Sequence, residues 1–276
     1  MKNTLINIMS LNKKIDVSVL LKRVRDRSPI VHHLTNWVTI YDCAQVVKSL
    51  GASPVMAHAS EEVEEMVELA SSLVLNIGTL TVEFVEAMKK AACAANKKGI
   101  PVVLDVCGAG ATSLRDKKCQ ELINEVRIDI IKGNASEISR VTGENIRTKG
   151  VDSSLVRFDL KDLAVKLATK NNSTVVITGE TDIIADKQRC YFVSNGHKIM
   201  SSLVGTGCMA ASVIGAFAAV EMDLVKASVS GLVCFEVAAE LAAKESKGPG
   251  SFKEKLFDSL YYLDLKKVSR MQRVRC

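Results

Sequence analysis

The sequence predicts an α/β fold in which one doubly wound, mainly parallel β-sheet carries helices on both faces. Aliphatic runs typical of strands alternate with stretches of helical spacing along the body of the chain. Aromatic residues make up only 4% of the 276 residues, so the core must consist of Val, Ile, Leu and Ala, as in parallel sheets. No internal repeat or Gly/Pro/Ser-rich linker divides the chain. We therefore expect a single domain over 1–276, with an N-terminal extension at 1–15 and a basic C-terminal tail at 264–276.

The expected elements alternate in a regular order. Strands are expected within 71–78, 100–111, 128–143 and 173–180. Helices are expected at 81–99 and 161–172, from residue 208 to about 244, and from the Gly-Pro-Gly break at 248–250 to about 263. The section 181–200 is rich in β-type residues, and its Asn195-Gly196 pair predicts a hairpin turn.

Composition and charge narrow the class of protein. The net charge of +6 is mild, and the basic cluster at 265–276 lacks the aromatic residues that stack on bases, so we expect a solvated terminus and no nucleic-acid partner. The eight cysteines form no C-x-x-C pair and fit no zinc module, which is typical of buried thiols in a reducing compartment. The apolar stretches near the N-terminus and at 209–220 are too short for a signal peptide or a membrane span. A cytoplasmic protein without membrane contact is expected.

Polar residues gather where the predicted strands end. Ligands of open α/β sheets bind at the carboxyl ends of the strands. Four such ends combine glycine with polar groups, and they lie at 76–79, 104–111, 131–137 and 177–182. These segments are therefore the expected site.

Two carboxylates at consecutive strand ends suggest a metal site. Asp105 ends the strand "PVVLD", and Glu137 follows the next strand in "KGNASE". Hard oxygen ligands suit a divalent ion, so together these residues make a plausible site for Mg²⁺ held mostly through water. Taken singly, Asp105 is equally explained as a turn cap and Glu137 as an ordinary acid in the first turn of a helix.

Phosphate contacts are predicted at the neighbouring strand ends. Lys132 and Asn134 close "IDIIKGN", where a lysine ammonium facing a cleft is a natural partner for phosphate. Thr178 and Gly179 offer a hydroxyl and bare backbone N–H groups. A surface lysine and a simple turn are the alternatives.

The strongest local signal is the stretch "GTGC". Gly205, Thr206, Gly207 and Cys208 enter a buried helix, so their amides have no intrahelical partner and form an anion site. Aimed at a transferring phosphoryl group, these amides would stabilise charge in the transition state, and their field would favour the thiolate of Cys208. The thiol could serve as a base, as a covalent nucleophile or as a passive small residue.

Three rival motifs are weaker. Gly205 to Ala210 fits G-x-G-x-x-A, but the acidic strand end that should follow about twenty residues later is missing. No G-x-x-x-x-G-K-[ST] occurs, which excludes a Walker-type nucleotidase. A cysteine hydrolase would need a histidine partner for Cys208, and spacing alone pairs it with none of His32, His33, His58 and His197.

Taken together, the motifs resemble the hydroxyethylthiazole kinase family of the ribokinase-like superfamily. The resemblance rests on "HHLTNWVT", "LGASPVMAHASEEVEEM", "LNIGTL", "VVLDVCGAGAT", "IIKGNASEI", "ITGETDIIAD" and "GTGCM". These stretches run in family order from about residue 29 to 245, and "GASPVMA" with "GTGC" is the most specific combination. Most superfamily members carry Asp where Cys208 stands, as the base that activates the substrate hydroxyl.

The resemblance implies transfer of the ATP γ-phosphoryl group to the alcohol of 4-methyl-5-(2-hydroxyethyl)thiazole, for thiamine biosynthesis or salvage. It further implies a homotrimer with the thiazole sites between subunits. The implied site residues are Met56, Asn36 and Gly205 for the thiazole, Cys208, Gly207 and Thr206 for catalysis, Lys132, Thr178 and Asn134 for ATP, and Asp105 and Glu137 for Mg²⁺. We expect the helix N-terminus to supply most of the rate enhancement, with Cys208 as a weak base or a passive member of the anion hole.

Some positions depart from the family pattern. Lys132 stands where many members have Arg, which keeps the charge but loses the bidentate fork. Val106 and Cys107 replace a Pro-Val pair, and Tyr41 and Gln45 differ near the expected thiazole pocket. Another ribokinase-like enzyme remains the alternative, either a pyrimidine or pyridoxal kinase or an NAD(P)H-hydrate dehydratase. A non-catalytic thiazole binder is the alternative of a different class.

Overall fold

The computed structural model describes residues 15–143 and 153–276, and the side chains of 153–159 are not described. The predicted N-terminal extension therefore lies, except for its last residue, outside the described part. Within these ranges no helix combines the length and the apolar character that crossing a bilayer requires.

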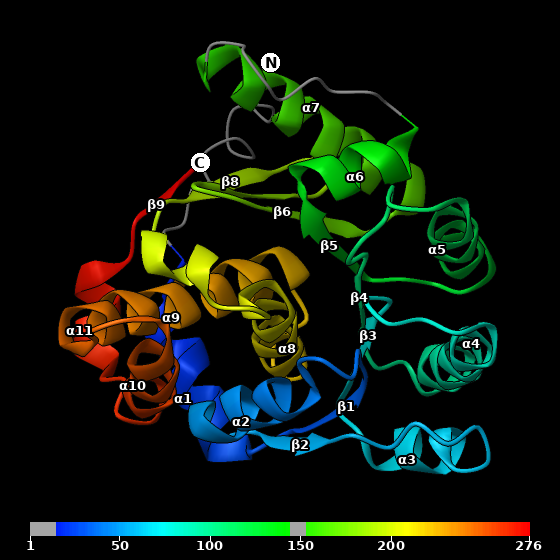
Figure 1. Cartoon of the computed structure of the whole chain (residues 1–276), viewed down its shortest axis with the longest axis horizontal. Helices are drawn as coiled ribbons and strands as arrows, with labels where there is room; N and C mark the ends of the chain where they lie inside the picture. The colour runs from blue at the N-terminus through cyan, green and yellow to red at the C-terminus, as the bar shows by residue number, and fades with distance from the viewer. Residues whose placement is uncertain (1–14, 144–152) are drawn as a thin grey trace, which may run out of the picture.

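A mixed, mainly parallel sheet runs through the described part of the chain. Its strand order is β2-β1-β3-β4-β5-β6-β7-β8-β9 (Figure 1). The pairs from β2 to β6 are parallel, and those from β6 to β9 are antiparallel. The bounds are β1 Ile30–Leu34, β2 Ser53–Val55, β3 Ser72–Asn76, β4 Val102–Asp105, β5 Ile130–Asn134, β6 Thr174–Thr178, β7 Asp182–Ala185, β8 Cys190–Val193 and β9 Val274–Arg275. The predicted fold class is confirmed.

Helices cover both faces of this sheet (Figure 1). One layer consists of α3 Val63–Leu69, α4 Val82–Lys98, α5 Ser113–Glu125, α6 Ala135–Thr142 and α7 Ser153–Asn171. The other consists of α1 Val17–Arg27, α2 Ile40–Leu50, α8 Thr206–Ala218, α9 Leu224–Glu245, α10 Pro249–Tyr261 and α11 Leu265–Met271. A short 3₁₀ helix, η1 Lys198–Ser202, leads into α8.

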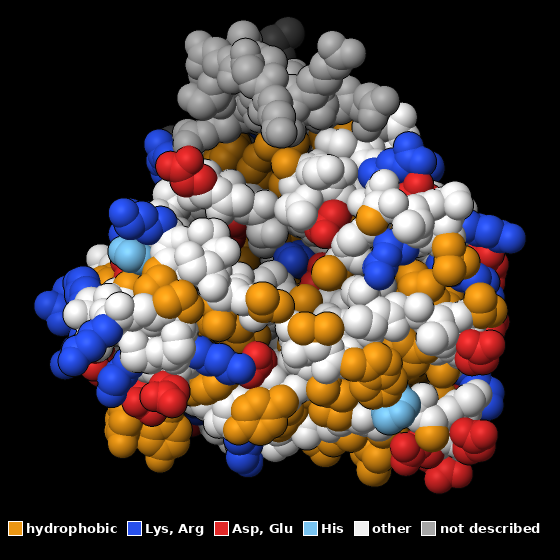
Figure 2. All heavy atoms as spheres, in the orientation of Figure 1, with side chains coloured by type: hydrophobic (Ala, Val, Ile, Leu, Met, Phe, Trp, Pro, Cys, Tyr) orange, Lys and Arg blue, Asp and Glu red, His pale blue; other side chains and the backbone are white. Residues whose placement is uncertain are grey.

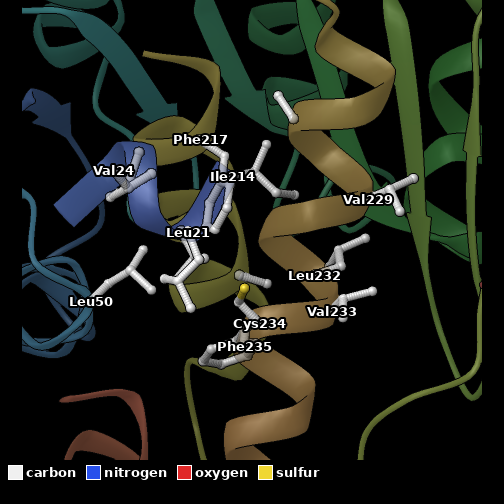
Figure 3. Packing of buried hydrophobic residues seen from close by; sticks show 14 of the residues in the cluster. Leu21, Val24, Leu50, Ile214, Phe217, Val229, Leu232, Val233, Cys234 and Phe235 are labelled. Carbon is white, nitrogen blue, oxygen red and sulfur yellow. The ribbon is translucent and has the colours of Figure 1, made fainter. Parts of the chain in front are cut away.

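Helix α8 is the centre of the larger hydrophobic core. Its residues from Cys208 to Ala218 are all buried, because α9 packs on one side and the sheet on the other. Figure 3 shows Ile214 and Phe217 of α8 among residues of α1 and α9 such as Leu21 and Phe235. Truncating a buried phenylalanine such as Phe217 to alanine costs about 3–5 kcal/mol.

Close contact with β3 fixes the position of α8 on the sheet. The Ser72 hydroxyl donates to the carbonyl oxygen of Gly215 at 2.8 Å. A methyl group at Gly215 would approach Cγ2 of Val74 to 2.4 Å, so the helix backbone lies as near the strand as glycine allows. The helix that begins at the glycine loop is therefore held by packing two to three turns further on.

The C-terminal part of the chain differs from the sequence-based expectation in two places. The basic segment at 264–276 is exposed or half-buried except at Val268, as a solvated terminus should be, but it is folded, because Asp264 caps α11 and Val274 pairs with Val193 of β8. The Asn195-Gly196 pair makes no hairpin. The hairpin between β7 and β8 turns instead at Asp186, whose carboxylate accepts from the amides of the two residues before Cys190.

Candidate active site

Four polar side chains converge at the carboxyl edge of the sheet. Asn36 follows β1, while Asn76, Asp105 and Lys132 lie in β3, β4 and β5, and all four are buried. Adjacent parallel strands bring these ends together, and the registers pair Asn76 with Asp105 and Asp105 with Lys132. This edge of the sheet therefore carries the charged centre that the strand ends predicted.

Hydrogen bonds join these four side chains into one connected network. Asn36 Nδ2 donates to Asn76 Oδ1 at 2.9 Å, and Asn76 Nδ2 donates to Asp105 Oδ2 at 2.7 Å. Lys132 Nζ donates to Asp105 Oδ1 at 3.3 Å. Because each group is buried and partnered, the network holds its side chains in a single arrangement.

The glycine loop places the first amides of α8 above this network. Gly205 is the N-cap of α8 with φ +92°, and a methyl group there would approach Cγ2 of Thr39 to 2.4 Å. The first helical hydrogen bond runs from the Met209 amide to the Gly205 carbonyl, so the amides of residues 206–208 precede the helical ladder. A methyl group at Gly207 would lie 3.0 Å from Lys132 Nζ. The first turn of α8 and the buried cation of Lys132 therefore lie next to each other.

Lys132 and Asp105 form a buried ion pair beneath the loop. Burial raises the pKa of Asp105, and the charges of Cys208 and Glu137 act in the same direction, while the Lys132 cation opposes them. Burial is the largest single influence and lowers the pKa of Lys132, but the charges of Asp105, Cys208 and Glu137 together outweigh it, so the pKa is raised and the ammonium stays charged. The predicted phosphate-binding lysine is thus a buried cation, and the surface-lysine alternative is wrong.

The Cys208 thiol lies against the same network. Asn36 Nδ2 and Asn76 Nδ2 each donate to Cys208 Sγ at 3.3 Å. A hydrogen bond from Cys107 is the largest influence that lowers the pKa of Cys208, and Thr39 and the Lys132 cation add to it against the effect of burial. The site therefore favours the thiolate form of Cys208.

A large cavity opens beside the glycine loop. Its volume is about 1040 Å³, and its lining includes the β6–β7 turn at 178–182, the loop at 194–198, Thr206 and Gly207. Leu232 and Phe235 of α9 supply an apolar part of the wall. Figure 2 shows that this face of the molecule is hollowed near its middle. Thr178 and the catalytic candidates Thr206 and Gly207 thus line one cavity.

Two carboxyl groups in the cavity wall escaped the sequence analysis. Asp182 and Glu236 are 2% and 6% exposed, and they come from β7 and α9. Burial raises the pKa of both, and the charge of Asp182 adds to the rise at Glu236, so burial favours the neutral form of these acids. Nothing in the sequence pairs two acids 54 positions apart, so only the fold reveals them.

Arg115 also escaped the sequence analysis. Its guanidinium donates to the carbonyl oxygens of Ile77 and Gly78 at 2.8 Å and of Cys107 at 3.3 Å. It therefore ties the loop after β3 to the loop after β4. As an ordinary residue of an amphipathic helix, it carried no signal in the sequence.

Glu137 and Asn134 act first as a helix cap. Asn134 Oδ1 accepts from the Glu137 amide at 2.9 Å, and Glu137 Oε2 accepts from the Asn134 amide at 2.7 Å, which together make a capping box on α6. The other oxygen of Glu137 accepts from the Gly108 amide at 2.8 Å. The Asn134 side chain is exposed and is not part of the cavity lining.

Met56 lies apart from the cavity, in the loop after β2. It is half-buried, and the adjoining carbonyl oxygen of Ala57 is held by His32 Nε2 at 2.7 Å. Nearby, Trp37 stacks on Phe84 with ring centroids 5.5 Å apart and meets His58 edge-on at 4.6 Å. The structure brings Asn36 to Cys208 directly, whereas it places Met56 near an aromatic surface.

Relatives that share about half of their residues with this chain have one name in common. The model of the hydroxyethylthiazole kinase family matches residues 21–266. A protein from Methanosarcina mazei named hydroxyethylthiazole kinase is 52% identical over 254 residues, which cover 92% of this chain and 97% of that protein. The chain belongs to the hydroxyethylthiazole kinase family.

Solved structures agree with this assignment. The structure of a hydroxyethylthiazole kinase protein from Pyrococcus horikoshii OT3 matches with a TM-score of 0.87 and 42% identity over 94% of this chain and 98% of that one. A ribokinase-like superfamily protein from Enterococcus faecalis matches at 14% identity and a TM-score of 0.64, over 93% of this chain and 98% of that one. The second likeness shows the fold alone. The predicted family and the ribokinase-like fold are confirmed.

The acidic residues of this hydroxyethylthiazole kinase family member fit a cation held largely through water and phosphate. In the described ranges no cluster of three or more His, Cys, Asp or Glu side chains could bind a metal unaided. Asp105 and Glu137 nevertheless interact electrostatically, and their charges together with a Cys208 thiolate exceed that of Lys132. Mg²⁺ commonly binds through one or two carboxylates plus substrate phosphates. The site has the anionic surplus that such an ion requires.

Proposed function

We propose that this chain transfers the γ-phosphoryl group of ATP to the hydroxyl of 4-methyl-5-(2-hydroxyethyl)thiazole, as a step of thiamine biosynthesis or salvage. The decisive feature is the N-terminus of α8, whose amides at 206–208 meet the Lys132 cation beside the Cys208 thiol. Family membership supplies the substrate class, and the cavity beside the loop has room for a nucleotide.

Catalysis by this arrangement consists of positioning and charge stabilisation. The transferring group carries negative charge on its equatorial oxygens, and fixed amides at 206–208 would stabilise that charge without reorganising. Lys132, held by Asp105, would add a positive charge that burial protects from screening. The alcohol oxygen attacks the γ-phosphorus, ADP leaves with the bridging oxygen, and the alcohol proton leaves the attacking oxygen.

Cys208 is the candidate acceptor of that proton. Its Sγ lies among donors that favour the thiolate, and a thiolate can accept one proton and return to the thiol. A thiolate is a modest base for an alcohol, so we assign most of the rate enhancement to the α8 amides. Asp105 and Glu137 would hold Mg²⁺, which neutralises phosphate charge when bound.

We also propose that the chain self-associates as a homotrimer. Exposed apolar side chains support this, because Trp37, Val38 and Tyr41 are 47%, 68% and 69% exposed just after the active-site Asn36. A subunit interface at this surface would place thiazole contacts such as Met56 near a second chain. Light scattering of the purified protein measures the mass directly, and a monomer at catalytic concentration would contradict the proposal.

The function is tested by ADP release with three acceptors, each with and without Mg²⁺. We expect turnover with hydroxyethylthiazole that depends on Mg²⁺, and none with hydroxymethylpyrimidine or pyridoxal. Turnover with either other alcohol would favour a different ribokinase-like kinase. ATP-dependent dehydration of NAD(P)H hydrate would favour the dehydratase. Tight thiazole binding without ADP release would indicate a non-catalytic binder.

A further inference from the structure

A single guanidinium holds two loops of the candidate active site. Arg115 Nη1 donates to the carbonyl oxygen of Ile77 at 2.8 Å and to that of Cys107 at 3.3 Å. Its Nη2 donates to the carbonyl oxygen of Gly78 at 2.8 Å. These acceptors lie just beyond β3 and β4, where backbone carbonyls need donors from outside the sheet. One half-buried side chain of α5 therefore satisfies three backbone groups of two different loops.

In the loop after β3, the peptide group that is held in this way orients Asn76. The Ile77 carbonyl and the Gly78 amide belong to one peptide group, and that amide donates to Asn76 Oδ1 at 2.9 Å. A methyl group at Gly78 would approach the same oxygen to 2.9 Å, so the loop lies close against the side chain. With its oxygen engaged, Asn76 presents Nδ2 to Asp105 and to Cys208.

The loop after β4 repeats this arrangement. The Cys107 carbonyl and the Gly108 amide belong to one peptide group, and that amide donates to Glu137 Oε1 at 2.8 Å. Gly108 has φ +78°, and a methyl group there would lie 3.0 Å from Arg115 Nη1, so the guanidinium lies directly against this peptide group. Glu137 Oε2 accepts from the Asn134 amide. Backbone amides therefore fix both oxygens of Glu137, and one of these amides depends on the guanidinium.

The planarity of the peptide group transmits the contact. A donor that fixes the carbonyl oxygen of a peptide also fixes the direction of its N–H. A cation at that oxygen polarises the peptide and strengthens the hydrogen bond that the N–H donates. Through one peptide group Arg115 thus acts on Asn76, which contacts the Cys208 thiol. Through the other it acts on Glu137, a candidate metal-binding residue.

We propose that Arg115 is a positioning residue for phosphoryl transfer, which acts through the peptide groups 77–78 and 107–108. It does not line the cavity beside the glycine loop, so its contribution is made through Asn76 and Glu137. Loss of the guanidinium would leave both peptide groups free to rotate and would displace the side chains that they orient. A misplacement of about 1 Å can cost about 10²-fold in rate. The effect on rate rests on the proposed function, whereas the effect on the two loops does not.

Arg25 offers a matched control in the opposite helical layer. Its half-buried guanidinium donates to the carbonyl oxygens of Leu263 at 2.8 Å and Leu260 at 3.1 Å, so it too holds backbone carbonyls with a forked side chain. Neither of these carbonyls belongs to a residue of the candidate site. Arg25→Ala should therefore lower the melting temperature without lowering kcat.

The test compares the wild type, Arg115→Ala, Arg115→Lys and Arg25→Ala as full-length proteins. ADP release gives kcat and both KM values at a temperature well below each melting temperature. Hydrogen exchange, followed by mass spectrometry of peptides that contain Gly78 or Gly108, reports on the two loops without any need for turnover. Each protein is also assayed with added guanidinium ion, at a concentration too low to denature it, because this ion can occupy the place of the removed side chain.

We expect the kcat of Arg115→Ala to fall about 10–100-fold, with KM values for ATP and the thiazole within about twofold of the wild type. Guanidinium should restore part of this loss and change nothing in Arg25→Ala. Both loops should exchange faster in Arg115→Ala than in the wild type or Arg25→Ala. Arg115→Lys keeps the charge but not the fork, so its rate should lie between those of the wild type and Arg115→Ala.

An unchanged kcat in folded Arg115→Ala, a loss that guanidinium does not restore, or unchanged exchange in the two loops would overturn the proposal. If Arg115→Ala does not fold, Arg115→Lys decides the question. Wild-type kcat and exchange in that variant would overturn the proposal, and a lower kcat with faster exchange in both loops would support it. Faster exchange in Arg115→Ala, in a protein whose wild type has no kinase activity, would count against the proposed function alone.

Discussion

The two halves of the sheet contribute differently to the active site. The parallel strands β1, β3, β4 and β5 end in buried, mutually bonded polar side chains that meet the N-terminus of α8. The antiparallel half instead contributes the β6–β7 turn, Asp182 at the start of β7 and the loop after β8 to the wall of a wide cavity, where Asp182 lies buried with Glu236 of α9. The parallel half of the sheet therefore holds individual polar side chains in place, whereas the antiparallel half forms part of the wall of a cavity.

This difference predicts how each half responds to substitution. A change at the parallel half displaces a charge or a donor from its place and should lower kcat. A change at the antiparallel half alters the shape or charge of a wall and should act on nucleotide KM or on stability. Separate measurements of kcat, KM and melting temperature for each variant test this division.

The largest effect is expected for Gly205→Ala. A methyl group at φ +92° would collide with Thr39 and move the amides at 206–208, so we expect kcat to fall about 10²–10³-fold, as for loss of an oxyanion donor. Gly99→Ala is the matched control, because Gly99 has φ +81° and open space around it. Steady-state kinetics should show normal kcat for the control. Equal losses in both variants would mean that backbone strain, rather than the anion site, is responsible.

A smaller loss of kcat is expected from changes at Cys208. If the amides do most of the catalysis, Cys208→Ala should lose less than about 10²-fold, the low end for a general base. Cys208→Asp should retain or exceed the wild-type rate, because a carboxylate can accept from Asn36 and Asn76 as the thiolate does. A folded but inactive Asp variant beside an active Cys208→Ser would contradict this assignment.

The buried Glu236 in the cavity wall should make the stability of the protein depend on pH. Burial, followed by the charge of Asp182, raises the pKa of Glu236, so the folded protein binds its proton more tightly than the unfolded chain does. This contribution to stability is complete at low pH and is lost as pH rises towards the raised pKa. As pH rises above the range in which an ordinary carboxyl group titrates, the melting temperature should therefore fall, by about 2–4 °C for each kcal/mol lost.

Glu236→Gln should flatten that profile, since an amide has no proton to lose. Glu180→Gln changes an exposed acid of the same cavity and should leave the slope as it is in the wild type. Thermal melts of the three proteins across the pH range make the comparison. An unchanged slope in Glu236→Gln would show that the folded protein does not bind a proton at Glu236 more tightly than the unfolded chain does.

The smallest effect is expected for Asn134→Ala. Loss of this N-cap should destabilise the protein by about 1 kcal/mol, and Thr112→Ala, which removes the cap of α5, should cost a similar amount. Because the Asn134 side chain is used as a cap outside the cavity lining, the KM for ATP should be the same in both variants. A severalfold higher KM in Asn134→Ala alone would restore the ATP contact predicted from the sequence.

Local sequence patterns were sufficient to predict most of the parallel half of the sheet. Aliphatic runs followed by polar residues identified β3, β4, β5 and β6, and the rule for strand ends singled out Asp105 and Lys132. The glycine pair before a buried run of residues identified the N-terminus of α8 at Gly205. Each of these signals lies within one short stretch of chain.

Features that join distant stretches could not be predicted in this way. Asp182 and Glu236 look like ordinary acids until the fold removes them from water, and Arg115 looks like any helix cation. The Asn195-Gly196 pair has the composition of a hairpin, but tertiary contacts override it, since Asn195 donates to Glu240 and to the Met271 carbonyl. The C-terminal strand needed the free edge of β8, which no local pattern reveals.

The contact of Gly215 with Val74 and Ser72 has a consequence for how this enzyme would tolerate change. The amides at 206–208 lie at the N-terminal end of α8, about 10–14 Å along the helix from its contact with β3 at 1.5 Å per residue. A slight tilt of α8 at its contact with β3 would therefore displace the amides at its N-terminus by a larger distance. Heat-sensitive variants of the interior should therefore lose turnover at temperatures where the chain is still folded.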